Sequence, residues 1–185
     1  MNFLNIFYSF LLITGMGLFT SCAVIPEKAK PVDGFDINLY TGSWYEVARL
    51  DHRFERDLDN VTAYYSLKDN GLVKVENRGY DRISKKWKSV SGLAKFRNQN
   101  NIGALKVSFF RPFYGSYNVI ALDKDYRYAL IAGNNLNYLW ILARTKNIPL
   151  DIRNTYLEMA KDIGYDTTNL IWVKQDMVNP SVNGQ

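Results

Sequence analysis

Cysteine and histidine are almost missing from this chain, with one of each in 185 residues. A single cysteine cannot form an intrachain disulfide, and one cysteine with one histidine is too few for a structural zinc site. One histidine is also weak support for an axial haem ligand. The sequence contains no Gly-x-Ser-x-Gly motif and no helical pair of carboxylates, so few nucleophile–base pairs are available. These absences argue against an enzyme and predict neither a metal nor a cofactor.

Charged side chains are missing from residues 1–21. The apolar part, residues 6–19, is shorter than the roughly 20 residues of a transmembrane helix and matches the apolar region of a secretory signal. It ends in Leu18-Phe19-Thr20-Ser21-Cys22, where small residues before a lone cysteine resemble a lipobox. We expect residues 1–21 to be a signal peptide and Cys22 to be the lipid attachment site. The alternative is cleavage elsewhere, with Cys22 there by chance.

An acylated Cys22 would hold the protein firmly to a membrane. Thioether and amide acylation supply several chains, and each buried CH₂ contributes about 0.8 kcal/mol, so the anchor is effectively permanent. Ala23 follows the cysteine, and the lack of Asp there fits sorting to the outer membrane. Residues 22–34 contain two prolines and no apolar period, which predicts a lipidated tether. We expect a lipid-anchored protein of the cell outer membrane that faces the periplasm.

The charge balance is only mildly basic, with 23 Lys and Arg against 18 Asp and Glu. The two signs alternate along the chain, as on a solvated surface. Binding of single-stranded nucleic acid needs exposed aromatics beside a continuous basic groove. The aromatics here fall mostly on strand faces expected to point inward, and a secretory signal argues further against it. We expect no nucleic-acid partner.

Apolar and polar residues alternate in short runs between turn signals, which predicts strands. The expected strands are residues 44–50, 61–67, 72–79, 87–96, 105–110, 117–122, 128–132 and 138–143. Asn70-Gly71 is a strong hairpin signal between the second and third. Eight antiparallel strands with hairpin connections can close into a barrel just wide enough for one small ligand. We therefore predict an all-β domain over residues 35–175, an eight-stranded antiparallel up-and-down barrel.

The pattern changes to a helical period over residues 150–163, between Pro149 and Gly164. One helix cannot fit inside so small a barrel, so this C-terminal α-helix is expected to pack on the outside. Residues 170–174 predict a short ninth strand. Residues 176–185 are expected to form a flexible tail.

Three residues frame the barrel. Gly42 precedes Trp44 at the head of the first strand, where only a residue without a Cβ suits a tight entry. Arg144 follows the last main strand and could lay its guanidinium across the indole. Gly42-Ser43-Trp44 and Arg144 resemble the first and third motifs of the lipocalin family, and residues 117–126 stand where the middle motif belongs. The resemblance covers roughly residues 35–174 and is strongest to bacterial outer-membrane lipocalins, with apolipoprotein D more distant.

The resemblance implies a hollow barrel that carries fatty acids, phospholipids or lysophospholipids for envelope maintenance under stress. Taking Trp44 as inward-facing, we chose for each strand the face with apolar or small residues as the cavity wall. The expected cavity residues are Ala48, Leu50, Ala63, Tyr65, Val75, Ala94, Phe96, Val107, Phe109, Tyr117, Val119, Tyr138 and Trp140. The strand over residues 128–132 is apolar on both faces, so the sequence does not show which of its faces points inward.

The mouth of the cavity is expected at a charged loop that holds His52, Arg53 and Phe54, together with residues 111–116. A buried Glu46 beside Trp44 and Arg144 is interpreted as structural. Several alternatives remain open: a filled barrel without a cavity, a pigment or haem carrier, and a lipocalin-fold enzyme. An exposed apolar mouth would favour a homodimer, although the oligomeric state cannot be read from the sequence.

Overall fold

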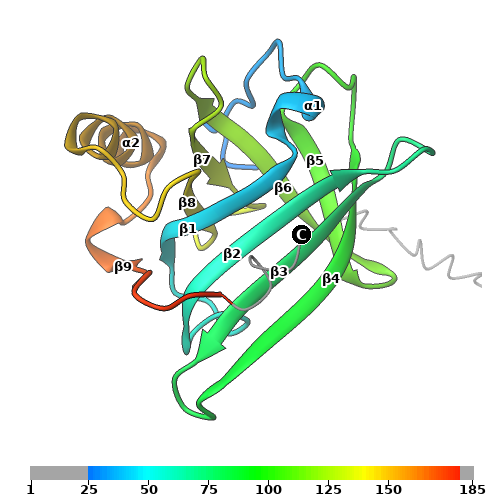
Figure 1. Cartoon of the computed structure of the whole chain (residues 1–185). Helices are drawn as coiled ribbons and strands as arrows, with labels where there is room; N and C mark the ends of the chain where they lie inside the picture. Colours follow the sequence, from blue (N-terminus) through cyan, green and yellow to red (C-terminus); the bar gives the residue numbers. More distant parts are fainter. Residues whose placement is uncertain (1–24, 180–185) are drawn as a thin grey trace, which may run out of the picture.

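The computed structural model describes residues 25–179, so the expected signal peptide and Cys22 lie outside the described residues. The main strands are β1 (Gly42–Leu50), β2 (Leu58–Leu67), β3 (Val73–Asp81), β4 (Lys86–Phe96), β5 (Ala104–Phe110), β6 (Phe113–Leu122), β7 (Tyr128–Ala132) and β8 (Leu139–Ala143). Each strand pairs antiparallel with the next, and β1 pairs with both β2 and β8. The sheet therefore closes on itself, which confirms the predicted eight-stranded barrel (Figure 1).

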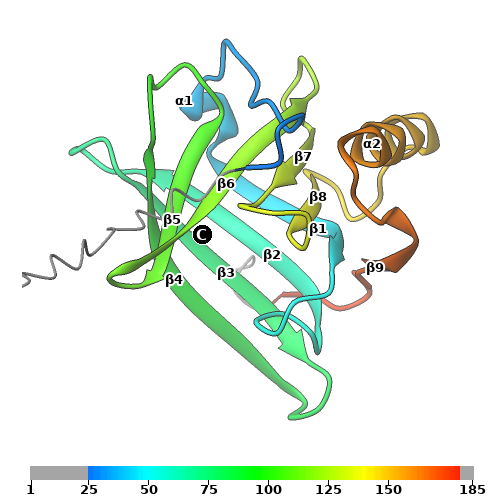
Figure 2. The same ribbon diagram turned by 180° about the vertical axis from the view of Figure 1, so that it is seen from behind.

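The helix α2 (Leu150–Ile163) lies on the outer wall, as both views of the ribbon show (Figures 1 and 2). It is attached through the hydroxyl of Tyr156, which donates to the carbonyl of Tyr128 at 2.9 Å. Gly164 ends the helix with φ +111°, a conformation in which glycine meets no steric cost. A short β9 (Leu170–Trp172) then pairs with β1. The outside position predicted for the helix is confirmed.

Two separate apolar clusters lie on the two sides of the barrel wall. One lies inside the barrel and includes Trp44, Tyr65, Val75 and Leu142. The other lies between the wall and α2 and includes Leu130, Tyr156 and Ala160. Strand β7 serves both, because Ala129 and Ile131 belong to the inner cluster while Tyr128, Leu130 and Ala132 belong to the outer one. Its apolar character on both faces therefore follows from being covered by the helix.

Ala48 and Leu50 do not face the cavity, which corrects the assignment made from the sequence. Both belong to the outer cluster under α2. The cause is a β-bulge, because Glu46 pairs with Leu142 and the next pair joins Ala48 to Ile141. Two steps along β1 match one step along β8, so the side chains after Glu46 change faces. A second shift in β6, between Val119 and Ala121, turns Ala121 outward for the same reason.

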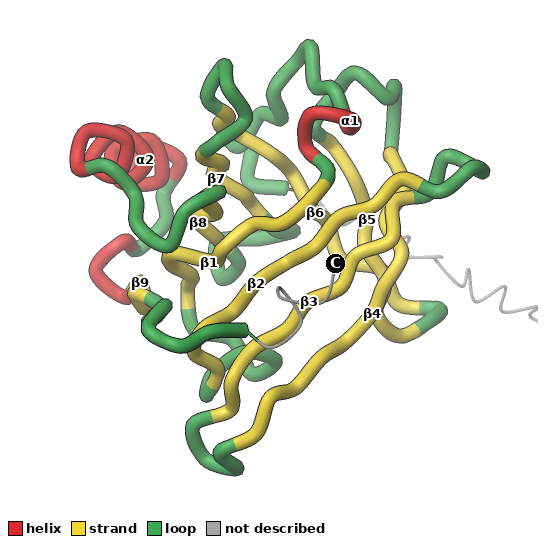
Figure 3. Tube along the Cα trace, viewed as in Figure 1, coloured by secondary structure: helices red, strands yellow, loops and turns green. Residues whose placement is uncertain are grey.

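The helix α1 (Ile37–Tyr40) lies across one end of the barrel (Figure 3). Buried side chains of the inner cluster close this end beneath it. Trp44 is fully buried there and donates its indole N–H to the carbonyl of Tyr40 at 2.8 Å. The Arg144 guanidinium lies 4.0 Å from the indole centroid and donates to the carbonyls of Ser43 and Leu39. At Gly42, φ is +90° and a Cβ would lie 3.4 Å from Arg144 Nη1, so a side chain there would be strained and crowded.

Both ends of the described chain are held against the barrel. Val32 donates to the Val119 carbonyl at 2.8 Å and accepts from Gly103 at 2.9 Å, and Ala29 is fully buried. Residues 29–34, which were expected to belong to the tether, are therefore part of the folded domain. At the other end, the side chain of Asn60 accepts from the backbone N–H of Met177 at 2.8 Å. The chain thus stays attached up to Asn179, and the rest of the expected tail lies outside the described residues.

Candidate ligand cavity

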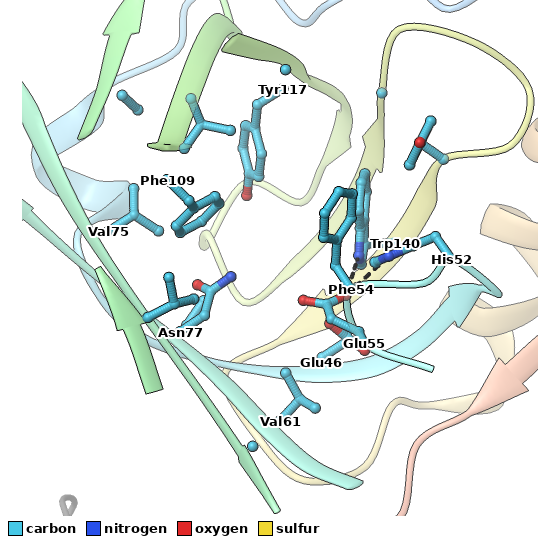
Figure 4. Close-up of a pocket in the computed structure, with 18 of the residues that line it drawn as sticks. Glu46, His52, Phe54, Glu55, Val61, Val75, Asn77, Phe109, Tyr117 and Trp140 are labelled. Carbon is cyan, nitrogen blue, oxygen red and sulfur yellow. Dashed lines mark hydrogen bonds and ion pairs between the residues drawn. The ribbon is translucent and has the colours of Figure 1, made fainter. Parts of the chain in front are cut away.

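A cavity of about 730 Å³ occupies the barrel interior, and its lining extends from Tyr40 of α1 to the exposed rings of Phe54, Phe110 and Phe113, where it opens. This volume lies within the roughly 300–1,000 Å³ typical of small-molecule sites. Apolar side chains from β2, β3, β5 and β8 form most of its wall, among them Val61, Val75, Phe109 and Trp140 (Figure 4). The barrel is therefore hollow, and the alternative of an interior filled by its own side chains is not what the structure shows.

Most of the residues assigned to the cavity from the sequence do line it. These are Ala63, Tyr65, Val75, Ala94, Val107, Phe109, Tyr117, Tyr138 and Trp140. Phe96 and Val119 belong to the inner cluster but lie outside the cavity wall. Phe96 packs edge-on against Phe35 at 6.2 Å, and Val119 is fully buried beside Gly103. Both therefore help to fill the closed end, beyond the cavity.

The inner end of the cavity carries a cluster of three tyrosine hydroxyls. Tyr117 Oη lies 2.6 Å from Tyr40 Oη and 2.9 Å from Tyr65 Oη. Burial raises the pKa of all three hydroxyls, so they stay neutral at any physiological pH. Three hydroxyls bring three protons, and the two contacts between them use two. The remaining proton is available to a polar ligand atom that reaches this depth.

The mouth is rimmed by aromatic side chains that water reaches. Phe54, Phe110 and Phe113 are 64%, 68% and 77% exposed, and all three line the cavity. Phe54 comes from the loop between β1 and β2, while the other two flank the turn between β5 and β6. Arg53 lies over the Phe54 ring at 5.3 Å. His52, Arg53 and Phe54 therefore stand at the mouth, where the sequence placed them.

A buried group of charged side chains forms one part of the wall just inside the mouth. Arg49 is 1% exposed, and its Nη1 donates to Glu46 Oε1 at 2.7 Å. Its Nη2 donates to the backbone carbonyls of Glu55 and Leu58, which holds the loop against β1. The sequence had paired Glu46 with Trp44 and Arg144. The bulge in β1 brings Arg49 to it instead, since Arg49 pairs across with the inward-facing Trp140.

His52 and Trp140 complete this group by binding the second carboxylate. Trp140 Nε1 donates to Glu55 Oε2 at 3.1 Å, and His52 Nε2 lies 3.0 Å from the same oxygen. His52 is only 8% exposed, so it is not the surface residue that a loop histidine would suggest. We call Glu46, Arg49, His52, Glu55 and Trp140 the mouth cluster. Figure 4 shows all of its members except Arg49.

The two carboxyl groups of the mouth cluster titrate differently. Burial raises the pKa of Glu46 well above its usual value, and the neighbouring Glu55 carboxylate raises it further. Burial also acts to raise the pKa of Glu55, but the interactions with His52, Trp140 and Arg49 together outweigh it, and the pKa is lowered. Glu46 is thus the group that holds a proton more readily in the folded protein.

Glu46, His52 and Trp140 were each predicted from the sequence, but with separate roles. Arg49, Glu55 and the contacts that join the five residues were not predicted. One signal was available: Arg49 interrupts the apolar run Val47-Ala48-Arg49-Leu50, and a charge within such a run needs a buried partner. The link from Glu55 to Trp140 spans 85 positions and carries no sequence signal. Across residues 25–179 there is no group of three or more side chains arranged to hold a metal. Within the same range, none of the helices has the length and apolar character needed to cross a bilayer.

Comparison with known proteins agrees with this architecture. A family model described as a lipocalin-like domain matches residues 35–175. The outer membrane lipoprotein Blc of Vibrio cholerae is 49% identical over 85% of this chain and 93% of its own length. Blc of Escherichia coli K12 is 49% identical over 81% of this chain and 85% of its own, and apolipoprotein D of Cavia porcellus is 34% identical over 68% and 69%.

Among solved structures, insecticyanin from the tobacco hornworm Manduca sexta superimposes with a TM-score of 0.64. It covers 78% of this chain and 83% of its own, at 18% identity, which supports the shared fold alone. At 49% identity over most of both chains, the outer-membrane location of the Blc lipoproteins extends to this protein. The chain therefore belongs to the lipocalin family, whose members carry small hydrophobic ligands.

Proposed function

We propose that this protein is a carrier that stores or moves fatty acids, phospholipids or lysophospholipids of the bacterial envelope and helps to maintain that envelope under stress. The observation that supports this role is the cavity of about 730 Å³ with a mainly apolar wall and an open mouth. A long acyl chain fits such a space because burial in it removes the chain from water. A carrier of this kind needs no chemical step, so no substrate turnover is expected.

The expected affinity follows from the area of chain that is buried. An acyl chain of about sixteen carbons gains on the order of 12 kcal/mol gross at about 0.8 kcal/mol per CH₂. Loss of ligand freedom and ordering of the chain remove much of this. A dissociation constant in the micromolar range or tighter results. Because burial is non-directional, chain type is expected to matter less than the polar groups at the mouth.

Native mass spectrometry of ligand-free protein tests this role. The protein is titrated with a fatty acid, a lysophospholipid and a diacyl phospholipid, and we expect one-to-one complexes with at least one of them. The control is the same titration with a short-chain, water-soluble analogue, which should form no complex. Failure of all three lipids to bind would refute the carrier role.

We further propose that the protein reaches the membrane through acyl chains on Cys22. Ala29 and Val32 are held by the barrel, so the six residues 23–28, or seven Cα–Cα steps, separate the anchor from the folded domain. At about 3.3–3.6 Å per residue, this link spans at most about 25 Å. The barrel would therefore stay close to the bilayer from which it could take its ligand.

Cys22→Ala should abolish incorporation of radiolabelled palmitate and release the protein from the membrane fraction, because no other thiol exists in the chain. The matched control is Ser21→Ala, which should leave labelling and membrane association intact. Labelling that survives Cys22→Ala would contradict the assignment.

A further inference from the structure

The mouth cluster carries more negative than permanent positive charge. Glu46 and Glu55 share a single permanently charged partner, Arg49, whose Nη2 is already occupied by backbone carbonyls. The other carboxylates that line the cavity have their own partners: Lys88 bonds to Asp81, and Arg82 lies 3.6 Å from Asp57. The cluster therefore has room for one more cationic group. A buried carboxylate without enough positive charge is costly, so such a group would be stabilised there.

Aromatic rings surround the same place. His52 packs edge-on against Trp140 at 5.3 Å between ring centroids and lies 5.7 Å from Tyr138. Tyr138 stacks on Trp140 at 6.1 Å, and Phe54 lies beside these rings at the mouth (Figure 4). Aromatic faces attract ammonium groups, most strongly where the cation has lost its water. Rings and carboxylates together are the chemistry that recognises an alkylated or primary ammonium.

The imidazole of His52 adds an independent sign of an incomplete site. The side chain lines the cavity and is more than nine-tenths buried. Nε2 lies 3.0 Å from Glu55 Oε2, and Nδ1 has no hydrogen-bond partner among residues 25–179. A buried polar atom without a partner is uncommon in a native structure. A polar atom of a bound ligand would satisfy it.

We propose that the mouth cluster is a subsite for the ammonium head group of a single-chain amphiphile whose hydrocarbon chain occupies the barrel. Glu46 and Glu55 supply the negative charge, and Trp140, Tyr138 and Phe54 supply the ring faces. This inference rests on the carrier role and narrows its ligand class. A free fatty acid has the opposite charge at its head and would be disfavoured at the same position.

Three dodecyl ligands that differ only in head charge separate these contributions. Calorimetric titration of the mature chain with dodecyltrimethylammonium, dodecanol and laurate should rank the cation first, by about tenfold over the neutral alcohol, and laurate last. Binding of dodecanol reports the apolar cavity alone. If the protein is not a carrier, none of the three ligands will bind. If all three bind with equal affinity, only the proposed ammonium subsite is overturned.

Glu46→Gln should reduce the preference for the cation to near unity while dodecanol binding changes by less than about twofold. Asp57→Asn is the matched control, because Asp57 also lines the mouth but is 46% exposed and contacts Arg82. It should keep the full preference. An unchanged preference in Glu46→Gln would overturn the proposal, and Glu55→Gln provides the same test if the first variant fails to fold.

The pH dependence of wild-type protein provides a readout without mutation. Glu46 must be ionised to attract the cation, and its raised pKa delays ionisation in the free protein. Affinity for dodecyltrimethylammonium, whose charge is fixed, should therefore increase as the pH rises through the Glu46 pKa. Arg49 on β1, Glu55 and His52 on the adjoining loop and Trp140 on β8 face this carboxyl group. A flat profile would contradict the proposal.

Natural amphiphiles with an ammonium group include both phospholipids and simple alkylamines. A second pair of ligands distinguishes these two classes. Lysophosphatidylethanolamine carries an ammonium, whereas lysophosphatidylglycerol with the same chain does not. A preference for the former that is lost in Glu46→Gln would identify a phospholipid head group. A preference limited to dodecyltrimethylammonium would identify simple amines, and no preference in either pair would overturn the subsite.

Discussion

Ala63→Trp should reduce acyl-chain affinity at least tenfold while the barrel still folds. Ala63 lines the cavity in the middle of β2, where its neighbours across the sheet are Trp44 on β1 and Asn77 on β3. An indole at this position would extend into the empty volume, so it would occupy the space of the ligand. Because it fills a void, the cost in unfolding free energy should stay below about 3 kcal/mol. Displacement of a fluorescent fatty acid measures the first effect, and urea denaturation measures the second.

Ser66→Trp on the same strand is the control for this substitution. Ser66 pairs with Lys74 on the outward face, so a tryptophan there adds the same ring without entering the barrel. Its affinity for the fluorescent ligand should match that of the wild type. Equal ligand affinity in Ala63→Trp and Ser66→Trp would mean that the chain binds outside the cavity, and the carrier model would fail in its present form.

The second large effect is expected for stability. Trp44→Ala should lower the unfolding free energy by about 3–5 kcal/mol, the range measured for large aromatic residues truncated in cores. The indole is fully buried, it bonds to the Tyr40 carbonyl, and Arg144 covers its other face. Its removal would leave a void at the closed end and release the arginine that binds α1. Chemical denaturation followed by circular dichroism measures the change.

Trp172→Ala serves as the comparison, since this indole is 37% exposed and its main contact is the Arg153 guanidinium at 3.8 Å. An exposed cation–π contact contributes about 0.5–1 kcal/mol, so a loss of this order is expected. Similar losses for the two tryptophans would show that Trp44 is not the centre of the closed end.

The barrel could be predicted from the sequence because the information that specifies it is local. Alternation with period two, the Asn70-Gly71 turn and the helical period before Gly164 each reveal an element without reference to the rest of the chain. Strand limits agree to within a few residues, and the first strand starts at Gly42 rather than Trp44. Because Trp44 was taken to face inward, the inward face of β1 was predicted correctly as far as Glu46.

The cavity could be predicted only in part, because a bulge adds one residue without changing the character of the sequence around it. Val47 and Ala48 are both small and apolar, so either could face the interior, and the register becomes clear only from the partners on β8. The mouth cluster depends on contacts between the loop after β1 and β8, which are distant in sequence. Such contacts follow from closure of the barrel, and no local pattern encodes them.

The bulge in β1 has a practical consequence for anyone who redesigns this protein to bind a new compound. A randomised library that assumes strict alternation would vary positions 46, 48 and 50. Positions 48 and 50 pack under α2, so changes there would disturb the packing of the helix rather than the binding site. Such a library would yield many unstable clones and few changes in selectivity. Diversity at Glu46, which lines the cavity, would act on the bound molecule directly.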